Sequence, residues 1–255
     1  MQNDSRKFAG KVALITGGNR GLGLETAKEL GSVGMTVVLG ARDPAKGETA
    51  AKKLRDAGIA AESLKLDVTK PEDYRTAYNY FDKKYGKLDV LVNNAGVMLD
   101  SAETSGDPSK HTSGVSPETL RGTFDANFFA PIALTQVLLP LIRKSEAGRI
   151  VNLSSILGSL TLHADPKSPI YSHKQLAYDA SKTALNAFTV HLAHELRDTP
   201  IKVNSAHPGW VQTEMGGPNA PMPLSEGGRT SAQLATLPAD GPSGGFFHLG
   251  DCLPW

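Results

Sequence analysis

The sequence predicts a doubly wound α/β fold, in which a parallel sheet of about seven strands carries helices on both faces. Short apolar runs such as residues 12–16 and 149–153 end in glycine or polar turn residues, which is typical of buried parallel strands. Helical patterns alternate with these runs five times without interruption, and a glycine-rich turn follows the first run. This combination favours a single open sheet whose ligand lies beyond the carboxyl ends of its strands.

The elements are expected in strict alternation along the chain. Strands are predicted at residues 12–16, 36–39, 62–66, 88–92, 149–153, 201–205 and 245–249. Helices are predicted from residue 22 onward and at about 45–57, 71–85, 117–144, 174–197 and 226–237. The polar, glycine- and serine-rich stretch 97–116 is expected to be an exposed loop at the rim.

Bulk composition limits the class of protein. The 255 residues, 40% of them hydrophobic, suit one catalytic domain spanning 1–255. A net charge of +1 without a basic run argues against nucleic acid and anionic membranes as partners. A single cysteine, Cys252, excludes an internal disulfide framework, and no apolar run reaches about 18 residues. We therefore expect a soluble, cytoplasmic protein.

A glycine turn follows the first predicted strand. Gly17, Gly21 and Gly23 have the spacing G-x-x-x-G-x-G, which differs from the usual G-x-G-x-x-G. Glycine lets the backbone approach a pyrophosphate, and the following helix offers free N–H groups and the positive end of its dipole. The strand, turn and helix together predict a Rossmann-like dinucleotide site.

Basic residues favour NADP(H) over NAD(H). The second strand ends near Arg42, and Arg20 lies in the glycine turn, whereas residues 39–41 contain no acid to hold a ribose 2′-hydroxyl. Arginine at this place suits a 2′-phosphate. Asp43 is a counter-argument, because its carboxylate could repel the phosphate or occupy Arg42. A solvated charge at the strand end is the simpler interpretation of Arg42.

Tyr178 and Lys182 lie four residues apart on one face of the predicted helix 174–197. An ammonium group one turn from a phenol is expected to lower the phenol pKa from about 10, which would suit proton exchange with a carbonyl oxygen. Taken alone, such a pair is more often part of an amphipathic surface.

Together these segments resemble the short-chain dehydrogenase/reductase family. The matching pieces, in the family's order and over nearly the whole chain, are Thr16-Gly17-x-x-x-Gly21-x-Gly23, Asp67, Asn93-Asn94-Ala95-Gly96, Asn127, Ser155, Tyr178-x-x-x-Lys182 and Pro208-Gly209. The resemblance implies a catalytic set of Asn127, Ser155, Tyr178 and Lys182, with Ser154 left as the alternative to Ser155. The implied cofactor-binding residues are Gly17, Asn19, Arg20, Gly21, Leu22, Gly23, Arg42, Asp67, Val68, Asn94, Ala95, Gly96, Tyr178, Lys182, Pro208, Gly209, Val211 and Thr213.

The separation of Ser155 and Tyr178 is longer than the family commonly shows, and the excess falls in the proline-rich stretch 163–169, which is predicted to be a loop. Such an insertion resembles the carbonyl reductase branch and favours a monomer or small homo-oligomer. The glycine- and proline-rich segment after Pro208 is expected to form a substrate lid around 210–237.

The expected function is hydride transfer between NADP(H) and a carbonyl or alcohol substrate, in the direction of ketone or aldehyde reduction. An NAD-linked alcohol dehydrogenase and a non-catalytic nucleotide-sensing protein on the same fold are the alternatives. No metal is expected, because the seven histidines form no recognisable ligand motif. The sequence leaves the particular carbonyl compound open.

Overall fold

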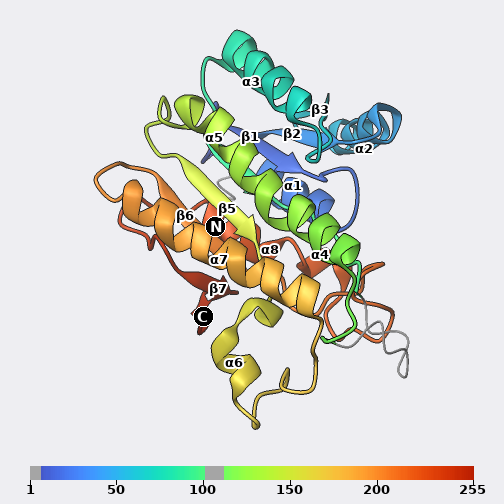
Figure 1. Ribbon diagram of the computed structural model, residues 1–255. Coiled ribbons are helices and arrows are strands. Elements are labelled where there is room, and N and C mark those ends of the chain that lie inside the picture. The colour runs from blue at the N-terminus through green and yellow to red at the C-terminus, as the bar shows by residue number, and fades with distance from the viewer. Residues whose placement is uncertain (1–6, 101–111) are drawn as a thin grey trace.

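The computed structural model describes residues 7–100 and 112–255, and they form an α/β sandwich around one sheet (Figure 1). The strand order is β3-β2-β1-β4-β5-β6-β7-β8. The strands are β1 Val12–Thr16, β2 Thr36–Ala41, β3 Ala61–Lys65, β4 Val90–Asn93, β5 Arg149–Leu153, β6 Lys202–Ala206, β7 Phe246–His248 and β8 Asp251–Cys252. The order reverses between β1 and β4, and at that reversal such sheets bind their ligands.

The seven predicted strands are confirmed as one parallel set, and an eighth strand was missed. β8 pairs antiparallel with β7 through Phe247 and Cys252. The two strands are joined by Leu249 and Gly250, which both have positive φ, 47° and 96°. Because β8 has only two residues and a leucine occupies the first turn position, no hairpin signal is present in the sequence.

The helices alternate with the strands. They are α1 Gly21–Ser32, α2 Pro44–Asp56, α3 Pro71–Tyr85, α4 Pro117–Phe124, α5 Ala130–Ile142, α6 Leu160–Ala164, α7 Leu176–Glu195 and α8 Arg229–Ala235. Short helical turns lie at η2 Asp125–Phe129, η3 Ile156–Gly158 and η4 Leu224–Glu226. The predicted helix 117–144 is therefore interrupted by the π-helical turn η2, which joins α4 to α5.

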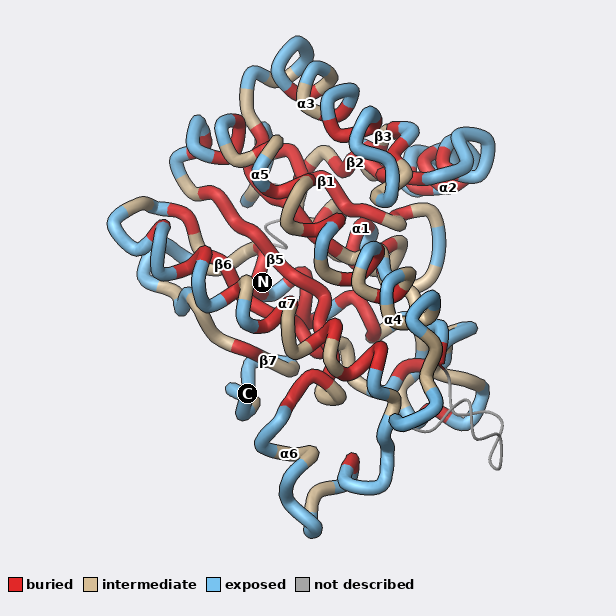
Figure 2. The backbone as a smooth tube through the Cα atoms, in the orientation of Figure 1, coloured by how far each residue is buried: buried red, intermediate tan, exposed pale blue. Residues whose placement is uncertain are grey.

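Side chains of each strand alternate between two cores. Val12 and Leu14 of β1 face the core built by α3, α5 and α7, whereas Ala13 and Ile15 face the core built by α1, α2 and α8. Figure 2 shows the strands buried at the centre and the outer sides of the helices exposed. Two-sided burial explains why the strands are continuous apolar runs rather than alternating ones.

The helical stretch Pro117–Ile142 is long and apolar enough to cross a membrane by length and composition. Its apolar side chains have another role, because Leu134, Leu138 and Leu141 are fully buried against the sheet. The stretch is a core helix of this fold.

The two predicted loops are the stretches 163–169 and 97–116. The stretch 163–169 was predicted to be wholly loop, and this is wrong at its start, because His163 and Ala164 belong to α6. The Ser159 hydroxyl caps that helix by accepting the Leu162 N–H at 3.2 Å, and the non-helical part begins at Asp165. Most of the predicted rim loop 97–116 lies outside the described residues.

Candidate active site

The glycine turn between β1 and α1 has the geometry of a phosphate cradle. Gly17 and Gly21 have φ values of 62° and 55°, a left-handed region that favours glycine. A Cβ on Gly23 would lie 2.6 Å from both Nδ2 of Asn94 and the Gly17 carbonyl oxygen. The N-terminus of α1 has no side-chain cap and no acid in its first turn. Its N–H groups can therefore bind an anion.

Asn94 fixes this turn from the end of the neighbouring strand. Its Nδ2 donates to the Thr16 carbonyl oxygen at 2.6 Å. The Thr16 hydroxyl in turn accepts the N–H groups of Asn94 and Ala95, each at 2.9 Å. Oδ1 of Asn94 is buried without a hydrogen-bond partner among the described residues. The sequence-predicted Asn94–Ala95–Gly96 segment thus lies against the glycine turn, as a cofactor site requires.

The ends of β2 and β3 bring Arg42 and Asp67 close together. Partial burial raises the pKa of Asp67, but hydrogen bonds from Thr69 and, to a smaller extent, the charge of Arg42 lower it, and the net shift is downward. Arg42 itself is exposed. Asp43 does not occupy Arg42, because its carboxylate caps α2 by accepting the Ala45 N–H at 2.9 Å. This answers the objection that Asp43 would occupy Arg42, whereas repulsion of a 2′-phosphate by its carboxylate stays open.

Arg20 has a partner that the sequence did not indicate. Its guanidinium forms an ion pair with Glu214, and both side chains are largely exposed. The pair connects the glycine turn with the segment that follows β6. Arg20 is therefore at the mouth of the site, with a carboxylate as its present partner.

Asn127 is fully buried in η2 and makes three side-chain hydrogen bonds. Oδ1 accepts the Val97 N–H at 2.8 Å, and Nδ2 donates to the Val97 carbonyl oxygen at 2.8 Å and to the Ser181 hydroxyl at 3.0 Å. Asn127 therefore joins the loop after β4 to α7. Two of the three bonds go to the backbone of Val97, so Asn127 has a structural role in this arrangement.

Ser154 and Ser155 at the end of β5 have different surroundings. The Ser155 hydroxyl accepts the Leu157 N–H at 3.2 Å and lies near enough to Tyr178 to lower the pKa of its phenol. The Ser154 hydroxyl is buried and has no partner among the described residues. The contact with Tyr178 favours Ser155 as the residue that would face a substrate carbonyl.

Tyr178 and Lys182 are both buried, 7% and 4% exposed. The Lys182 ammonium lies 5.5 Å from the centre of the Tyr178 ring and donates to the Leu153 carbonyl oxygen at 2.8 Å. Burial raises the pKa of Tyr178 to about 12, although the nearby Ser155 hydroxyl acts in the opposite direction. The expectation that the lysine lowers the phenol pKa is wrong for this state of the protein, because burial outweighs every other influence.

The segment after β6 lies against the same region. Gly209 has φ 93°, and Val211 is buried and bridges to Met222. The Thr213 hydroxyl accepts the Gly216 N–H at 2.9 Å. Within the expected lid 210–237, α8 is largely buried and packs on α1. Only the part before α8 is exposed enough to serve as a cover.

Two residues near the site have contacts that the sequence did not assign to them. Asp100 accepts the N–H groups of Ala177 and Tyr178 at 2.6 and 3.2 Å, which caps α7 from a distant loop. His207 accepts the Ile156 N–H at Nδ1, 3.2 Å away, and thereby supports the turn after Ser155. Neither contact has a local sequence signal, since each joins segments at least 51 residues apart.

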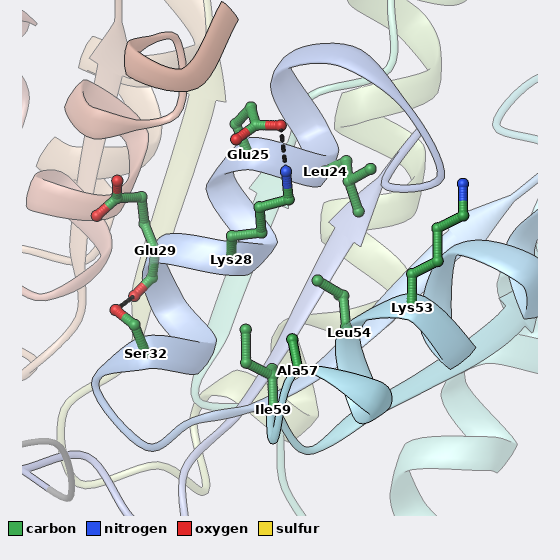
Figure 3. A pocket seen from close by; sticks show the side chains of 9 residues that line it. All are labelled: Leu24, Glu25, Lys28, Glu29, Ser32, Lys53, Leu54, Ala57 and Ile59. Carbon is green, nitrogen blue, oxygen red and sulfur yellow. Dashed lines mark hydrogen bonds and ion pairs between the residues drawn. The ribbon is translucent and has the colours of Figure 1, made fainter.

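A separate hollow of about 610 Å³ lies between α1 and α2 (Figure 3). Lys28, Lys53 and Ile59 are among the residues that line it. Most of its lining comes from the later turns of both helices, which lead to the starts of β2 and β3. It therefore lies away from the carboxyl ends of the strands and from Tyr178.

The residues present fit a dinucleotide. Three features lie along the strand ends. The glycine turn has no room for a Cβ at Gly23, and the N-terminus of α1 has no side-chain cap. The buried oxygens Oδ1 of Asn94 and Oγ of Ser154 have no hydrogen-bond partner among the described residues. Gly96 connects this cradle to the polar set, because a Cβ there would lie 3.5 Å from the Lys182 ammonium. The fold and the site place this chain in the class of dinucleotide-binding proteins that have a buried serine, tyrosine and lysine.

The chain belongs to the short-chain dehydrogenase family, whose model matches residues 11–223. It is 32% identical to carbonyl reductase (NADPH) 1 of Mus musculus, over 96% of this chain and 98% of that protein. It is similar in structure to the NADPH-bound carbonyl reductase from chicken fatty liver, with a TM-score of 0.82, 26% identity and coverage of 97% and 99%. Salutaridine reductase from Papaver somniferum has a TM-score of 0.78 and 30% identity, with coverage of 93% and 99%.

Proposed function

We propose that this protein is an NADP(H)-dependent carbonyl reductase that converts a ketone or an aldehyde to an alcohol. The observation that carries the proposal is the buried set at the end of β5: Ser155 lies near enough to Tyr178 to lower the pKa of its phenol, and the Lys182 ammonium lies 5.5 Å from the centre of the Tyr178 ring. Similarity to NADPH-linked carbonyl reductases over nearly the whole chain supports the cofactor and the substrate class.

The chain's own residues have separable roles. Ser155 donates a hydrogen bond to the substrate oxygen, and Tyr178 transfers its hydroxyl proton to that oxygen. Lys182 places a positive charge beside the phenol ring as the proton leaves. When bound, the dinucleotide supplies the hydride that forms the new C–H bond, so that the alcohol and the oxidised nucleotide result. Asn127 connects α7 to the loop after β4 and supports proton resupply.

The residues that would hold the nucleotide lie along the strand ends. The turn of Gly17, Asn19, Gly21, Leu22 and Gly23 takes the pyrophosphate, and Arg42 with Arg20 takes the 2′-phosphate. Asp67 and Val68 border the adenine, and Asn94 to Gly96 follow the ribose side. Pro208, Gly209, Val211 and Thr213 line the nicotinamide end.

The lid, the assembly and the location are further proposals. We assign the lid to residues 210–228, because α8 is part of the core. Residues 1–255 are proposed to act as one catalytic domain, in a monomer or small homo-oligomer of the cytoplasm. Size-exclusion chromatography with light scattering would test the assembly, and a tetramer would contradict it.

A panel of ketones, aldehydes, quinones, steroids and terpenoid ketones, followed by oxidation of NADPH, tests the function. Turnover of at least one class with NADPH, and weaker turnover with NADH, is expected. Preference for NADH would favour the NAD-linked alternative. Nucleotide binding without turnover of any carbonyl compound or alcohol would favour the non-catalytic one.

A further inference from the structure

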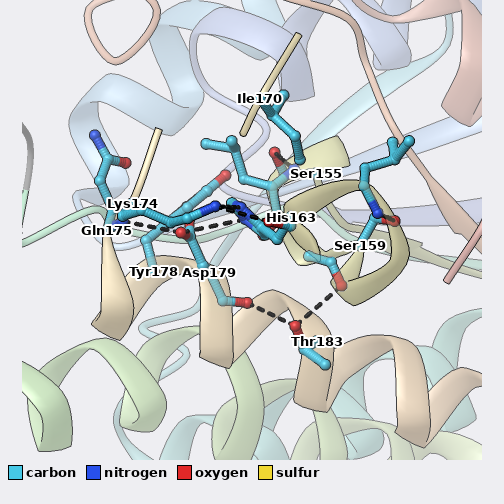
Figure 4. Close-up of polar contacts among 12 residues, drawn as sticks. Ser155, Ser159, His163, Ile170, Lys174, Gln175, Tyr178, Asp179 and Thr183 are labelled. Carbon is cyan, nitrogen blue, oxygen red and sulfur yellow. Dashed lines mark hydrogen bonds and ion pairs between the residues drawn. The ribbon is translucent and has the colours of Figure 1, made fainter. Parts of the chain in front are cut away.

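His163 of the insertion bridges the two segments that carry Ser155 and Tyr178 (Figure 4). Its Nε2 lies 2.9 Å from the Leu157 carbonyl oxygen and 3.3 Å from Oδ2 of Asp179. Leu157 comes two residues after Ser155, and Asp179 comes directly after Tyr178. One imidazole therefore contacts both the serine turn and the tyrosine helix.

Lys174 determines which ring nitrogen of His163 carries the proton. Its ammonium lies 3.1 Å from Nδ1 and also donates to the His163 carbonyl oxygen at 3.0 Å. Since an ammonium can only donate, Nδ1 accepts and Nε2 carries the hydrogen. Burial and the nearby charges of Lys174 and His173 lower the pKa of His163, although its bond to the Leu157 carbonyl raises it. The neutral ring thus directs its one N–H to the Leu157 carbonyl oxygen, and Oδ2 of Asp179 lies 3.3 Å from the same nitrogen, on the positive side of the ring.

Asp179 directly follows Tyr178 in α7 and is largely buried. Its side chain and that of His163 are each 12% exposed. Oδ2 accepts the Gln175 N–H at 2.9 Å, which closes the first turn of α7 from inside. Oδ1 is buried and has no hydrogen-bond partner among the described residues. Oδ2 therefore makes the contacts of this carboxylate, with the Gln175 N–H at the start of α7 and with His163.

The charged groups around Asp179 come from three segments. Burial, and to a smaller extent the carboxylate of Asp100 in the loop after β4, raise its pKa to about 7. The Gln175 N–H and the ammonium of Lys174 act in the opposite direction. His163 of α6 is the remaining titratable group in contact. Ionisation of Asp179 near neutral pH follows from this balance.

We propose that His163 and Asp179 form a clasp that positions the phenol of Tyr178 against Ser155, and that the ionised carboxylate is the form that holds the clasp closed. The inference rests on the proposed function. Both are positioning residues, because they act through the serine turn and through the backbone of α7. When Asp179 takes up a proton, its attraction for the Nε2–H of His163 falls and the two segments are less firmly joined.

Substitution of His163 tests the bridge. His163→Leu removes the N–H, and we expect kcat to fall at least fivefold while the KM for NADPH stays within twofold. His163→Gln keeps a donor near the Nε2 position and should retain at least half of kcat. His173→Leu is the matched control, since this exposed histidine, which lies shortly after the insertion, should tolerate the change. Equal kcat in His163→Leu and wild type would overturn the clasp, as would equal losses in both His163 variants.

Asp179→Asn tests the charge, because the amide still accepts the Gln175 N–H. We expect kcat of the wild type to rise with pH through about 7 and kcat of the variant to stay low without that rise. The melting temperature of the variant at pH 8 should rise, since a buried charge is removed. If Asp179 had only a structural role, Asp179→Asn would lower the melting temperature and leave the pH profile of kcat unchanged. That result would overturn the proposal.

A readout without turnover separates this inference from the proposed function. The ring ¹⁵N and ¹H resonances of His163, assigned with His163→Gln, should show the Nε2–H tautomer and should shift as Asp179 titrates near neutral pH. The shift should be lost in Asp179→Asn. Unchanged His163 resonances in that variant would overturn the clasp, whereas a normal titration in a protein that reduces no carbonyl compound would overturn only the proposed function.

Discussion

The ammonium of Lys182 lies 5.5 Å from the centre of the Tyr178 ring, and its hydrogen bond goes to the Leu153 carbonyl at the end of β5. The lysine is therefore anchored to the sheet while its charge stands beside the phenol. Burial raises the pKa of Tyr178 to about 12 and lowers that of Lys182 to about 8. At neutral pH the tyrosine is a protonated acid, which suits reduction of a carbonyl.

Tyr178→Phe should remove turnover and spare nucleotide binding. General acid catalysis contributes roughly 10²–10⁴-fold, so kcat should fall by that order. The Kd for NADPH, measured by fluorescence titration, should change by less than about twofold, since only the hydroxyl is lost. Tyr171→Phe is the control, because Tyr171 is an exposed tyrosine just after the insertion. Turnover close to the wild-type rate would refute the catalytic assignment.

Lys182→Met should reduce turnover and alter the pH dependence of stability. The folded-state pKa of Lys182, about 8, is below its ordinary value of 10.5. Between these values the unfolded chain binds more protons, so stability from this group rises as pH rises through that window. Below pH 8 the buried charge costs on the order of 1–3 kcal/mol.

Chemical denaturation at pH 7 and pH 10 measures this effect. The variant should be more stable than wild type at pH 7, and the difference should shrink at pH 10. Turnover of the wild type should also fall as pH rises through about 8, where Lys182 loses its charge. A variant that is less stable at pH 7 would contradict the direction of this shift.

The fold was predictable because its signals are local. Residues 12–16 and 149–153 are apolar runs buried on both faces, and their predicted bounds agree with β1 and β5. The glycine turn was found because Gly17 and Gly21 need positive φ, which few residues other than glycine adopt without strain. β8 escaped prediction because two residues leave no pattern.

The polar contacts of the site were less predictable, because they join distant parts of the chain. Asp100 caps α7 across 77 residues, and His163 approaches Asp179 only because the insertion folds back on α7. The direction of the Tyr178 pKa shift depends on burial, which no spacing in the sequence reports. Family resemblance supplied Ser155 and Asn127, and their contacts came from the structure.

Arg42→Asp should weaken NADPH binding and leave NADH binding unchanged or improved. Loss of a charge-assisted phosphate contact costs about 1.5–3 kcal/mol, roughly 10- to 100-fold in Kd. An aspartate there could also hold a ribose 2′-hydroxyl. Lys53→Asp is the matched charge reversal, because Lys53 is exposed in the last turn of α2, away from the strand ends. An unchanged ratio of NADPH to NADH affinity would show that Arg42 is a solvated surface charge.

Gly23→Ala should damage the cradle itself. The added Cβ would meet Nδ2 of Asn94 at 2.6 Å, and Asn94 cannot withdraw freely because that nitrogen donates to the Thr16 carbonyl. The turn must shift, at a cost of typically 1–3 kcal/mol in stability. The shift also moves the N–H groups that would bind the pyrophosphate, so the Kd for NADPH should rise by roughly tenfold or more.

Gly58→Ala separates the two effects. Gly58 has φ 82° and open space around it, so alanine there strains the backbone without a clash. It lies between α2 and the start of β3, whereas the cradle follows the carboxyl end of β1. Calorimetric titration with NADPH should therefore show wild-type affinity in Gly58→Ala despite its lower melting temperature. Equal loss of affinity in both variants would mean that general destabilisation, and not the contact of Gly23 with Asn94, controls nucleotide binding.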